Sequence, residues 1–213
     1  MENILEYVKE KWNALTAFSK KEELKEQLWN EIVYHYSAQH RHYHNLHHIA
    51  HLFTLCDGYL DKIKNPAVVG FAILYHDVVY DTYRQDNEEQ SALFAEVHLK
   101  QLMVNHALIK SVQTFIRATK DHRVPERELM AEDLALFLDF DMAILSTDSD
   151  IYESYSSRIR QEYLKYPEDI YKEGRKQALQ KVLASPRIFI TSNFRETEEG
   201  KARENILTEI RQL

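Results

Sequence analysis

The sequence predicts an all-α fold: a helical bundle forming a single domain over residues 1–213. Only four glycines and four prolines punctuate the 213 residues, too few for a chain of many short strands and tight turns. Apolar residues recur at helical spacing along most segments. With 44% hydrophobic residues, the chain is long enough to bury a sizeable core. Long helices packed around that core are therefore the expected architecture.

Cap residues and apolar periodicity set the expected elements, in order along the chain. Ser19 and Glu22 have the spacing of a capping box for the second helix. Asn45 is expected to cap the third helix, and Asn65-Pro66 to begin the fourth. The run from Ile188 to Thr191 is the only one that resembles a strand. We expect about nine or ten helices, over residues 2–18, 19–37, Asn45 onward, 66–80, 86–103, 106–121, 125–146, 150–165, 167–184 and 196–213.

Composition excludes several classes of function. The net charge of −7 argues against a surface that neutralises a nucleic-acid duplex. The single cysteine, Cys56, excludes an intrachain disulfide and suits a reducing compartment. No apolar stretch has the length that a bilayer requires, and the first residues lack the plan of a signal peptide. We expect a cytoplasmic protein with no membrane partner.

Histidines are concentrated in one part of the chain. Seven of the eleven lie between His35 and His51. On a helix beginning near Asn45, His44, His48 and His51 share one face with leucines. This mixed face indicates a helix covered on both sides, with imidazoles pointing into the protein.

Two further apolar segments carry carboxylates. The segment from Pro66 to Tyr80 is apolar on every side and contains His76-Asp77, and an aspartate buried there needs a partner. In the segment from Leu134 to Leu145, Asp141 falls on the apolar stripe and Asp139 on the side of Glu132. We therefore expect Asp141 to be the buried carboxylate and Asp139 to face solvent or to support a ligand.

One divalent ion would satisfy all of these polar groups together. The predicted ligands are His48, His76, Asp77 and Asp141, and imidazole with carboxylate suits Mn, Fe, Co, Ni, Mg or Zn. Because no thiolate is among them, a structural zinc site is not expected.

The same residues resemble the HD superfamily of metal-dependent phosphohydrolases, in which a histidine, a His-Asp pair and a late aspartate surround an ion. The segments 41–49, 75–81, 86–92 and 138–145 look like a bacterial group of predicted HD phosphohydrolases of undetermined substrate. The resemblance implies a bundle of the HD-domain type, with a metal-site core at about 40–146 and C-terminal helices, 150–213, packed on it. Residues 43–48 also resemble the Tyr-His-Asn-x-x-His element of cyclic-nucleotide phosphodiesterases, which implies His44 as general acid and His48 as metal ligand. His47 and His51 repeat this spacing, so either could replace a member of the pair.

The resemblance implies hydrolysis of a phosphate ester, with a nucleotide among the candidate substrates, by a metal-activated water and with Asp77 orienting it. Further candidates for the second shell or for substrate contact are Arg41, Asp81, Glu88, Lys120, His122, Asp139 and Arg175. Two alternatives stay open: an HD-type iron oxygenase and a non-catalytic module that binds a nucleotide or metal. A homodimer also stays open.

Overall fold

The structure, a computed structural model, describes residues 2–213 and confirms the all-α prediction. Within these residues it contains eleven α-helices, one short 3₁₀ helix and no strand. The chain divides into two compact units, residues 1–137 and 138–213, so the interpretation as a single domain stays a prediction. Among the described residues, no helix combines the length and the apolar character needed to cross a membrane.

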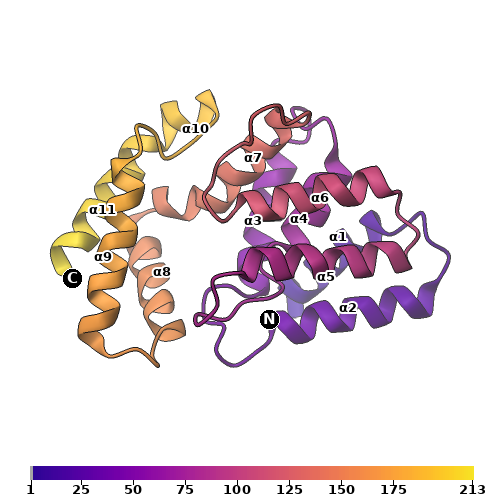
Figure 1. Cartoon of the computed structure of the whole chain (residues 1–213), viewed down its shortest axis with the longest axis horizontal. Helices are drawn as coiled ribbons and strands as arrows, with labels where there is room; N and C mark the ends of the chain where they lie inside the picture. The colour runs from indigo at the N-terminus through magenta and orange to yellow at the C-terminus, as the bar shows by residue number, and fades with distance from the viewer. Residues whose placement is uncertain (1) are drawn as a thin grey trace. The chain divides into compact units, whose positions relative to one another are not determined.

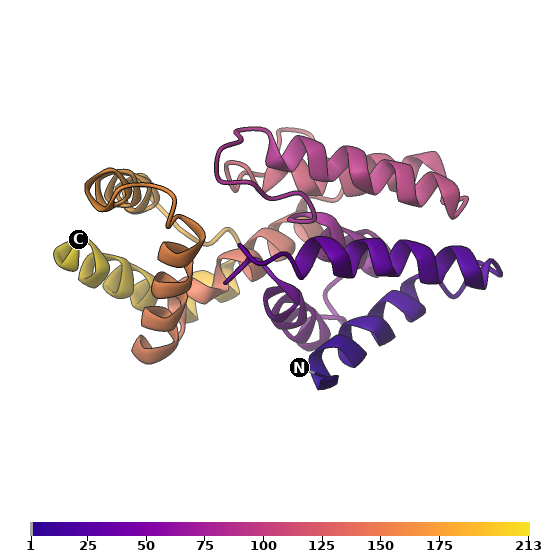
Figure 2. The same ribbon diagram turned by 90° about the horizontal axis from the view of Figure 1, so that it is seen from below.

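The first unit surrounds one central helix. Helix α4 packs against α1, α3, α5 and α6, and it lies behind α5 and α6 in Figure 1. Figure 2 shows α5 and α6 side by side at one edge of the unit, with α1 at the opposite edge. The helices of this unit are α1 (Glu2–Leu15), α2 (Glu22–Tyr36), α3 (Leu46–Gly58), α4 (Pro66–Tyr75), α5 (Asn87–Gln101), α6 (His106–Ala118) and the beginning of α7 (Ala131–Met142).

Helix α4 is central because its sequence offers no polar face. Its residues from Val68 to Tyr75 are all buried. The helix was expected to reach Tyr80, but it ends at Tyr75, because side chains form hydrogen bonds with the backbone groups that follow. The Arg41 side chain donates hydrogen bonds to the carbonyls of Asp77 and Val78, and the Ser91 hydroxyl accepts one from the N–H of Val79. This early end leaves His76 and Asp77 at the helix terminus.

Two predicted helix starts were also wrong. Helix α2 begins at Glu22 with Lys21 at its cap position and no side-chain cap, so Ser19 and Glu22 do not form a capping box. The helix expected from Pro125 begins only at Ala131. The preceding residues form turns instead, with a left-handed backbone at Arg127 and the N–H of Met130 donating to the Glu128 carboxylate.

The second unit is organised around its last helix. Helix α11 (Glu199–Gln212) packs against α8 (Ser149–Glu162), α9 (Glu168–Ala184), α10 (Ser192–Thr197) and the 3₁₀ helix η1 (Ala143–Ser146). At its centre the carboxylate of Glu209 accepts two hydrogen bonds from Arg175, at 2.8 and 3.1 Å, and one from Tyr152 at 2.6 Å. Arg175, which the sequence suggested for substrate contact, therefore has its guanidinium hydrogen-bonded to Glu209 inside the second unit.

The strand-like run Ile188–Thr191 is a loop rather than a strand. Its N–H groups donate to carboxylates, those of Ile188 and Phe189 to Glu199 and those of Ile190 and Thr191 to Asp139. Because these donors are satisfied by side chains, the segment needs no partner strand.

Candidate metal centre

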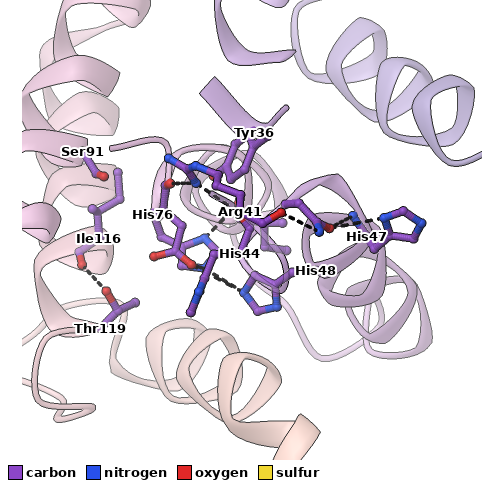
Figure 3. A network of polar contacts seen from close by, with 12 residues as sticks. Tyr36, Arg41, His44, His47, His48, His76, Ser91, Ile116 and Thr119 are labelled. Atoms are coloured by element: carbon purple, nitrogen blue, oxygen red, sulfur yellow. Dashed lines mark hydrogen bonds and ion pairs between the residues drawn. The ribbon is translucent and has the colours of Figure 1, made fainter. Parts of the chain in front are cut away.

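Two buried histidines meet where α3 begins and α4 ends. The Asn45 side chain caps α3 by accepting the N–H of His47 at 2.9 Å, which confirms the predicted cap. His48 follows in the first turn of α3 and is 3% exposed, and His76 is 1% exposed. Figure 3 shows the rings of His48 and His76 converging, with Arg41 and His44 beside them.

The side-chain atoms of His48, His76 and Asp77 form a small triangle. The Nε2 atoms of the two histidines lie 3.1 Å apart. The Oδ2 atom of Asp77 lies 3.1 Å from the Nε2 of His76 and 3.7 Å from that of His48. A point equidistant from these three atoms is about 1.9 Å from each, close to the roughly 2.0–2.2 Å typical of metal bonds to imidazole and carboxylate. The residues therefore fit a divalent ion on one side of the triangle.

Hydrogen bonding orients the His76 ring for this role. Its Nδ1 lies 3.0 Å from the carbonyl of Ile73, and since a carbonyl only accepts, Nδ1 carries the proton. The Nε2 of the neutral ring then presents a lone pair to the triangle. A backbone carbonyl holding the far nitrogen is a usual arrangement for histidines that bind metals.

Arg41 holds the backbone around the triangle. Its buried guanidinium donates to the carbonyls of His44, Asp77 and Val78 at 3.0, 2.6 and 2.8 Å, and it lies 5.0 Å from the centre of the Tyr36 ring. The sequence suggested Arg41 as a contact for substrate phosphate. The structure instead places it on the main chain, where it fixes the residue that carries the Asp77 carboxylate.

His44 lies beside the triangle without belonging to it. Its ring stacks on Tyr80 at 4.3 Å and is 5.9 Å from the ring of His48, centre to centre. The side chain is only partly buried. The stacking on Tyr80 was not foreseen, although Tyr80 closely follows the His-Asp pair. His44 is thus held near the candidate ligands in a position that solvent can reach.

Of the two alternative histidines, the structure directs His47 away from this group. His47 is exposed, and Figure 3 shows its ring directed away from His48 and His76. Its Nδ1 lies 3.2 Å from the side-chain oxygen of Asn45. His51 lies one turn after His48 and is half-buried. Its burial, and to a smaller extent the charge of His48, lower the pKa of His51.

The expected burial of the two late aspartates was wrong. Asp139 is the buried one, 1% exposed, whereas Asp141 is partly exposed. Asp139 accepts the N–H groups of Ile190 and Thr191 at 2.7 and 2.8 Å and the Thr191 hydroxyl at 2.6 Å. Burial raises its pKa, against the opposing effect of these hydrogen bonds. The loop that covers Asp139 is distant in sequence, so helical periodicity could not reveal it.

The remaining candidates lie on the segments that follow α4 and α6. Asp81 shapes its own turn: its carboxylate accepts the N–H of Tyr83 at 2.9 Å, and its N–H donates to Asn87. Glu88 is half-buried in the first turn of α5. Lys120 donates to the carbonyl of Gln85 at 2.7 Å, and His122 has a left-handed backbone, with φ of 52°. None of these four belongs to the triangle of atoms described above.

The described geometry therefore supplies three converging ligand atoms, a fixed imidazole beside them and a buried arginine that holds their backbone. In comparisons with known proteins, no family model, no curated protein and no solved structure matches this chain.

Proposed function

We propose that this protein is a metal-dependent phosphohydrolase that cleaves a phosphate ester at the His48, His76 and Asp77 triangle. The observation that carries the proposal is the 3.1–3.7 Å spacing of the three ligand atoms. Two neutral imidazoles and one carboxylate leave coordination positions open on a six-coordinate ion. Open positions are what a hydrolytic site needs for water and for a substrate oxygen.

Asp141 completes the proposed set of ligands. Helix α7 is continuous: it begins in the first unit and runs on through Asp141. The ring of Phe137 meets the His76 ring edge-on, with 5.8 Å between centres. Asp141 follows Phe137 by four residues, one helical turn further along the same side of the helix. We therefore assign to Asp141 the role of a fourth ligand.

A divalent ion in this site supplies Lewis acidity toward the phosphoryl oxygen and makes water more acidic. Asp77 accepts a hydrogen bond from the attacking water and so orients its oxygen toward phosphorus. As the new P–O bond forms, the attacking water releases a proton to solvent, the ester P–O bond breaks, and His44 donates a proton to the departing alkoxide oxygen. Tyr80 keeps the His44 ring in place during this transfer, and Arg41 keeps Asp77 in place.

Metal content tests the ligands directly. His48→Ala and Asp77→Asn should each weaken the affinity for Mn²⁺ by roughly tenfold or more. Elemental analysis after equilibration with Mn²⁺ should show this as a lower metal content. His47→Ala is the matched control, since His47 neighbours His48 on α3 but points away, and it should bind metal as the unaltered protein does. Equal metal content in all of these proteins would refute the site.

Leaving-group dependence tests His44. In the metal-loaded protein, His44→Gln should retain metal but lose about 10²-fold in kcat on an alkyl phosphate. It should lose little on p-nitrophenyl phosphate, whose leaving group needs no proton. An equal loss on both substrates would contradict the role of general acid.

A substrate screen separates the proposal from its two rivals. Phosphomonoesters, phosphodiesters and nucleotides are incubated with the metal-loaded protein, and released phosphate or alcohol is measured. Consumption of oxygen by the iron-loaded protein without hydrolysis would favour an oxygenase. Binding of a nucleotide without any turnover would favour a regulatory module.

A further inference from the structure

Two side chains of α5 hold the main chain on both sides of Tyr80. The hydroxyl of Ser91 accepts the N–H of Val79 at 3.1 Å and donates to the carbonyl of the same residue at 3.2 Å. The side-chain amide of Asn87 does the same for Asp81, accepting its N–H at 3.1 Å and donating to its carbonyl at 2.9 Å. Since Val79 and Asp81 are the chain neighbours of Tyr80, α5 fixes the residue before it and the residue after it.

The spacing of Asn87 and Ser91 suits them to this joint role. They are four residues apart on α5, so one helical turn places both side chains on the same face. A hydroxyl and a primary amide can each donate and accept without carrying a charge, and a residue with one N–H and one carbonyl needs both. Both residues belong to segment 86–92, which the resemblance covers without implying a role for either.

Groups that precede α3 hold the residues in between. The carbonyl of Tyr80 lies 3.2 Å from the Nε2 of His40, and since a carbonyl only accepts, Nε2 is the donor. The carbonyl of Val78 accepts from Arg41 at 2.8 Å. The residues from Val78 to Asp81 are thus held alternately by the segment before α3 and by α5. A shift of the main chain at Tyr80 would break bonds to both.

The ring of Tyr80 depends on this main chain for its position beside His44. The two rings stack with 4.3 Å between centres and 29° between planes, and the Cζ of Arg41 lies 5.5 Å from the centre of the Tyr80 ring. Displacement of a reacting group by about 1 Å can cost about 10²-fold in rate. Groups that fix Tyr80 therefore also fix the alignment of His44.

We propose that Asn87 and Ser91 are positioning residues: they hold Tyr80, and through its ring they keep His44 aligned as the proton donor. This inference rests on the proposed function, because it gives both residues a part in the proposed reaction. It also divides the work between the two groups that hold this segment. Arg41 serves the metal ligands, whereas α5 serves the proton donor.

Leaving-group dependence tests this role in the metal-loaded full chain. Ser91→Ala should retain Mn²⁺ and lose roughly tenfold or more in kcat on an alkyl phosphate, with KM little changed. It should lose little on p-nitrophenyl phosphate, whose leaving group needs no proton. Asn87→Ala should behave in the same way, and it serves as the second variant if Ser91→Ala does not fold. Equal losses on both substrates would contradict the inference.

The stacked rings give a second signal, which needs no activity. Protons of the His44 ring lie over the face of the Tyr80 ring and should resonate upfield in the NMR spectrum of the full chain loaded with diamagnetic Zn²⁺. His44→Gln identifies these signals by their absence, and Tyr80→Leu gives their positions without the stack. Ser91→Ala and Asn87→Ala should each lose most of the upfield shift. Unaltered His44 signals in both variants would overturn the inference.

Ser146→Ala is the matched control. Ser146 is also buried, and its hydroxyl donates to a main-chain carbonyl, that of Ala143, at 2.9 Å. This variant should lose stability in urea unfolding, as Ser91→Ala does, yet leave the His44 signals and the ratio of the two kcat values unchanged. Displaced His44 signals in the α5 variants, with no hydrolysis by the unaltered protein, would instead refute the proposed function and with it the catalytic part of this inference.

Discussion

At the scale of single residues, Arg41 is the side chain on which the metal centre depends most. One guanidinium serves three carbonyls, those of His44, Asp77 and Val78. It thereby joins the segment before α3 to the segment after α4. A planar group with several donors can make these bonds at once, whereas an ammonium group cannot reach all three.

Arg41→Lys should therefore destabilise the protein by about 2–4 kcal/mol and weaken Mn²⁺ binding, because charged hydrogen bonds to buried carbonyls are lost. Urea unfolding and metal titration measure the two effects. Arg158→Lys, at an exposed position of α8, is the control and should change neither. A stable Arg41→Lys protein with unaltered metal affinity would show that Arg41 does not position Asp77.

His98 is a buried histidine in the first unit whose protonation should affect stability. It lies between the hydroxyl of Tyr75, at 3.2 Å, and the carboxylate of Glu31, at 3.1 Å. Burial lowers its pKa below the ordinary value of 6.5, and Glu31 opposes this shift. Because the unfolded chain then binds the proton more readily, stability from His98 is present above pH 6.5 and is lost as pH falls through the lower, folded pKa.

The unaltered protein should accordingly lose more free energy of unfolding between pH 7 and pH 5 than His98→Gln does, both measured by urea unfolding at about 25 °C. His106→Gln, at an exposed position in α6, should follow the unaltered protein. Parallel pH profiles for all three proteins would exclude His98 as the titrating group.

At the scale of elements, the start of α4 is held by a carboxylate from α7. Asp133 is buried and accepts hydrogen bonds from the N–H groups of Lys64 and Asn65 at 2.9 and 2.7 Å. These donors precede α4, where the predicted cap residue Asn65 makes no side-chain cap. Asp133 thus connects α7, which carries Asp141, to the segment just before α4, the helix that ends next to His76.

Asp133→Ala should cost about 2–4 kcal/mol, because it removes a buried carboxylate that accepts three hydrogen bonds, from the N–H groups of Lys64 and Asn65 and from the Asn65 side chain. Glu132→Ala is a matched control in the same turn. The Glu132 carboxylate is exposed and pairs with the exposed Lys64, so its loss should cost less than about 1 kcal/mol. Thermal unfolding of both variants measures the difference, and equal losses would contradict the role of Asp133.

At the scale of the whole molecule, the chain passes from the first compact unit to the second within α7, between Phe137 and Leu138. The three atoms of the metal triangle belong to the first unit, and Asp141 to the second. If His48, His76, Asp77 and Asp141 all bind one ion, as proposed, then binding of the ion should also stabilise α7. Ligand binding at a hundred times Kd stabilises the bound state by about 2.7 kcal/mol.

Hydrogen exchange measured with and without Mn²⁺ checks this link. We expect slower exchange around His48 and His76 and also in the last turn of α7. Asp141→Asn should keep the first effect and lose the second. Protection confined to the first unit in both proteins would remove Asp141 from the set of ligands, while leaving the triangle intact.

Helical periodicity and residue chemistry by themselves determined the all-α class, the cap at Asn45 and the central apolar helix that begins at Pro66. They also singled out His48, His76 and Asp77 as candidate ligands. These features are readable because they are local: caps, period and the cost of an isolated buried charge depend on neighbouring residues. Only the tertiary structure decided that α4 stops at Tyr75, that Arg41 binds backbone, that His47 points away and that Asp139 rather than Asp141 is buried. In each case the deciding partner is a group that helical periodicity does not place, such as the Ile190–Thr191 loop that covers Asp139.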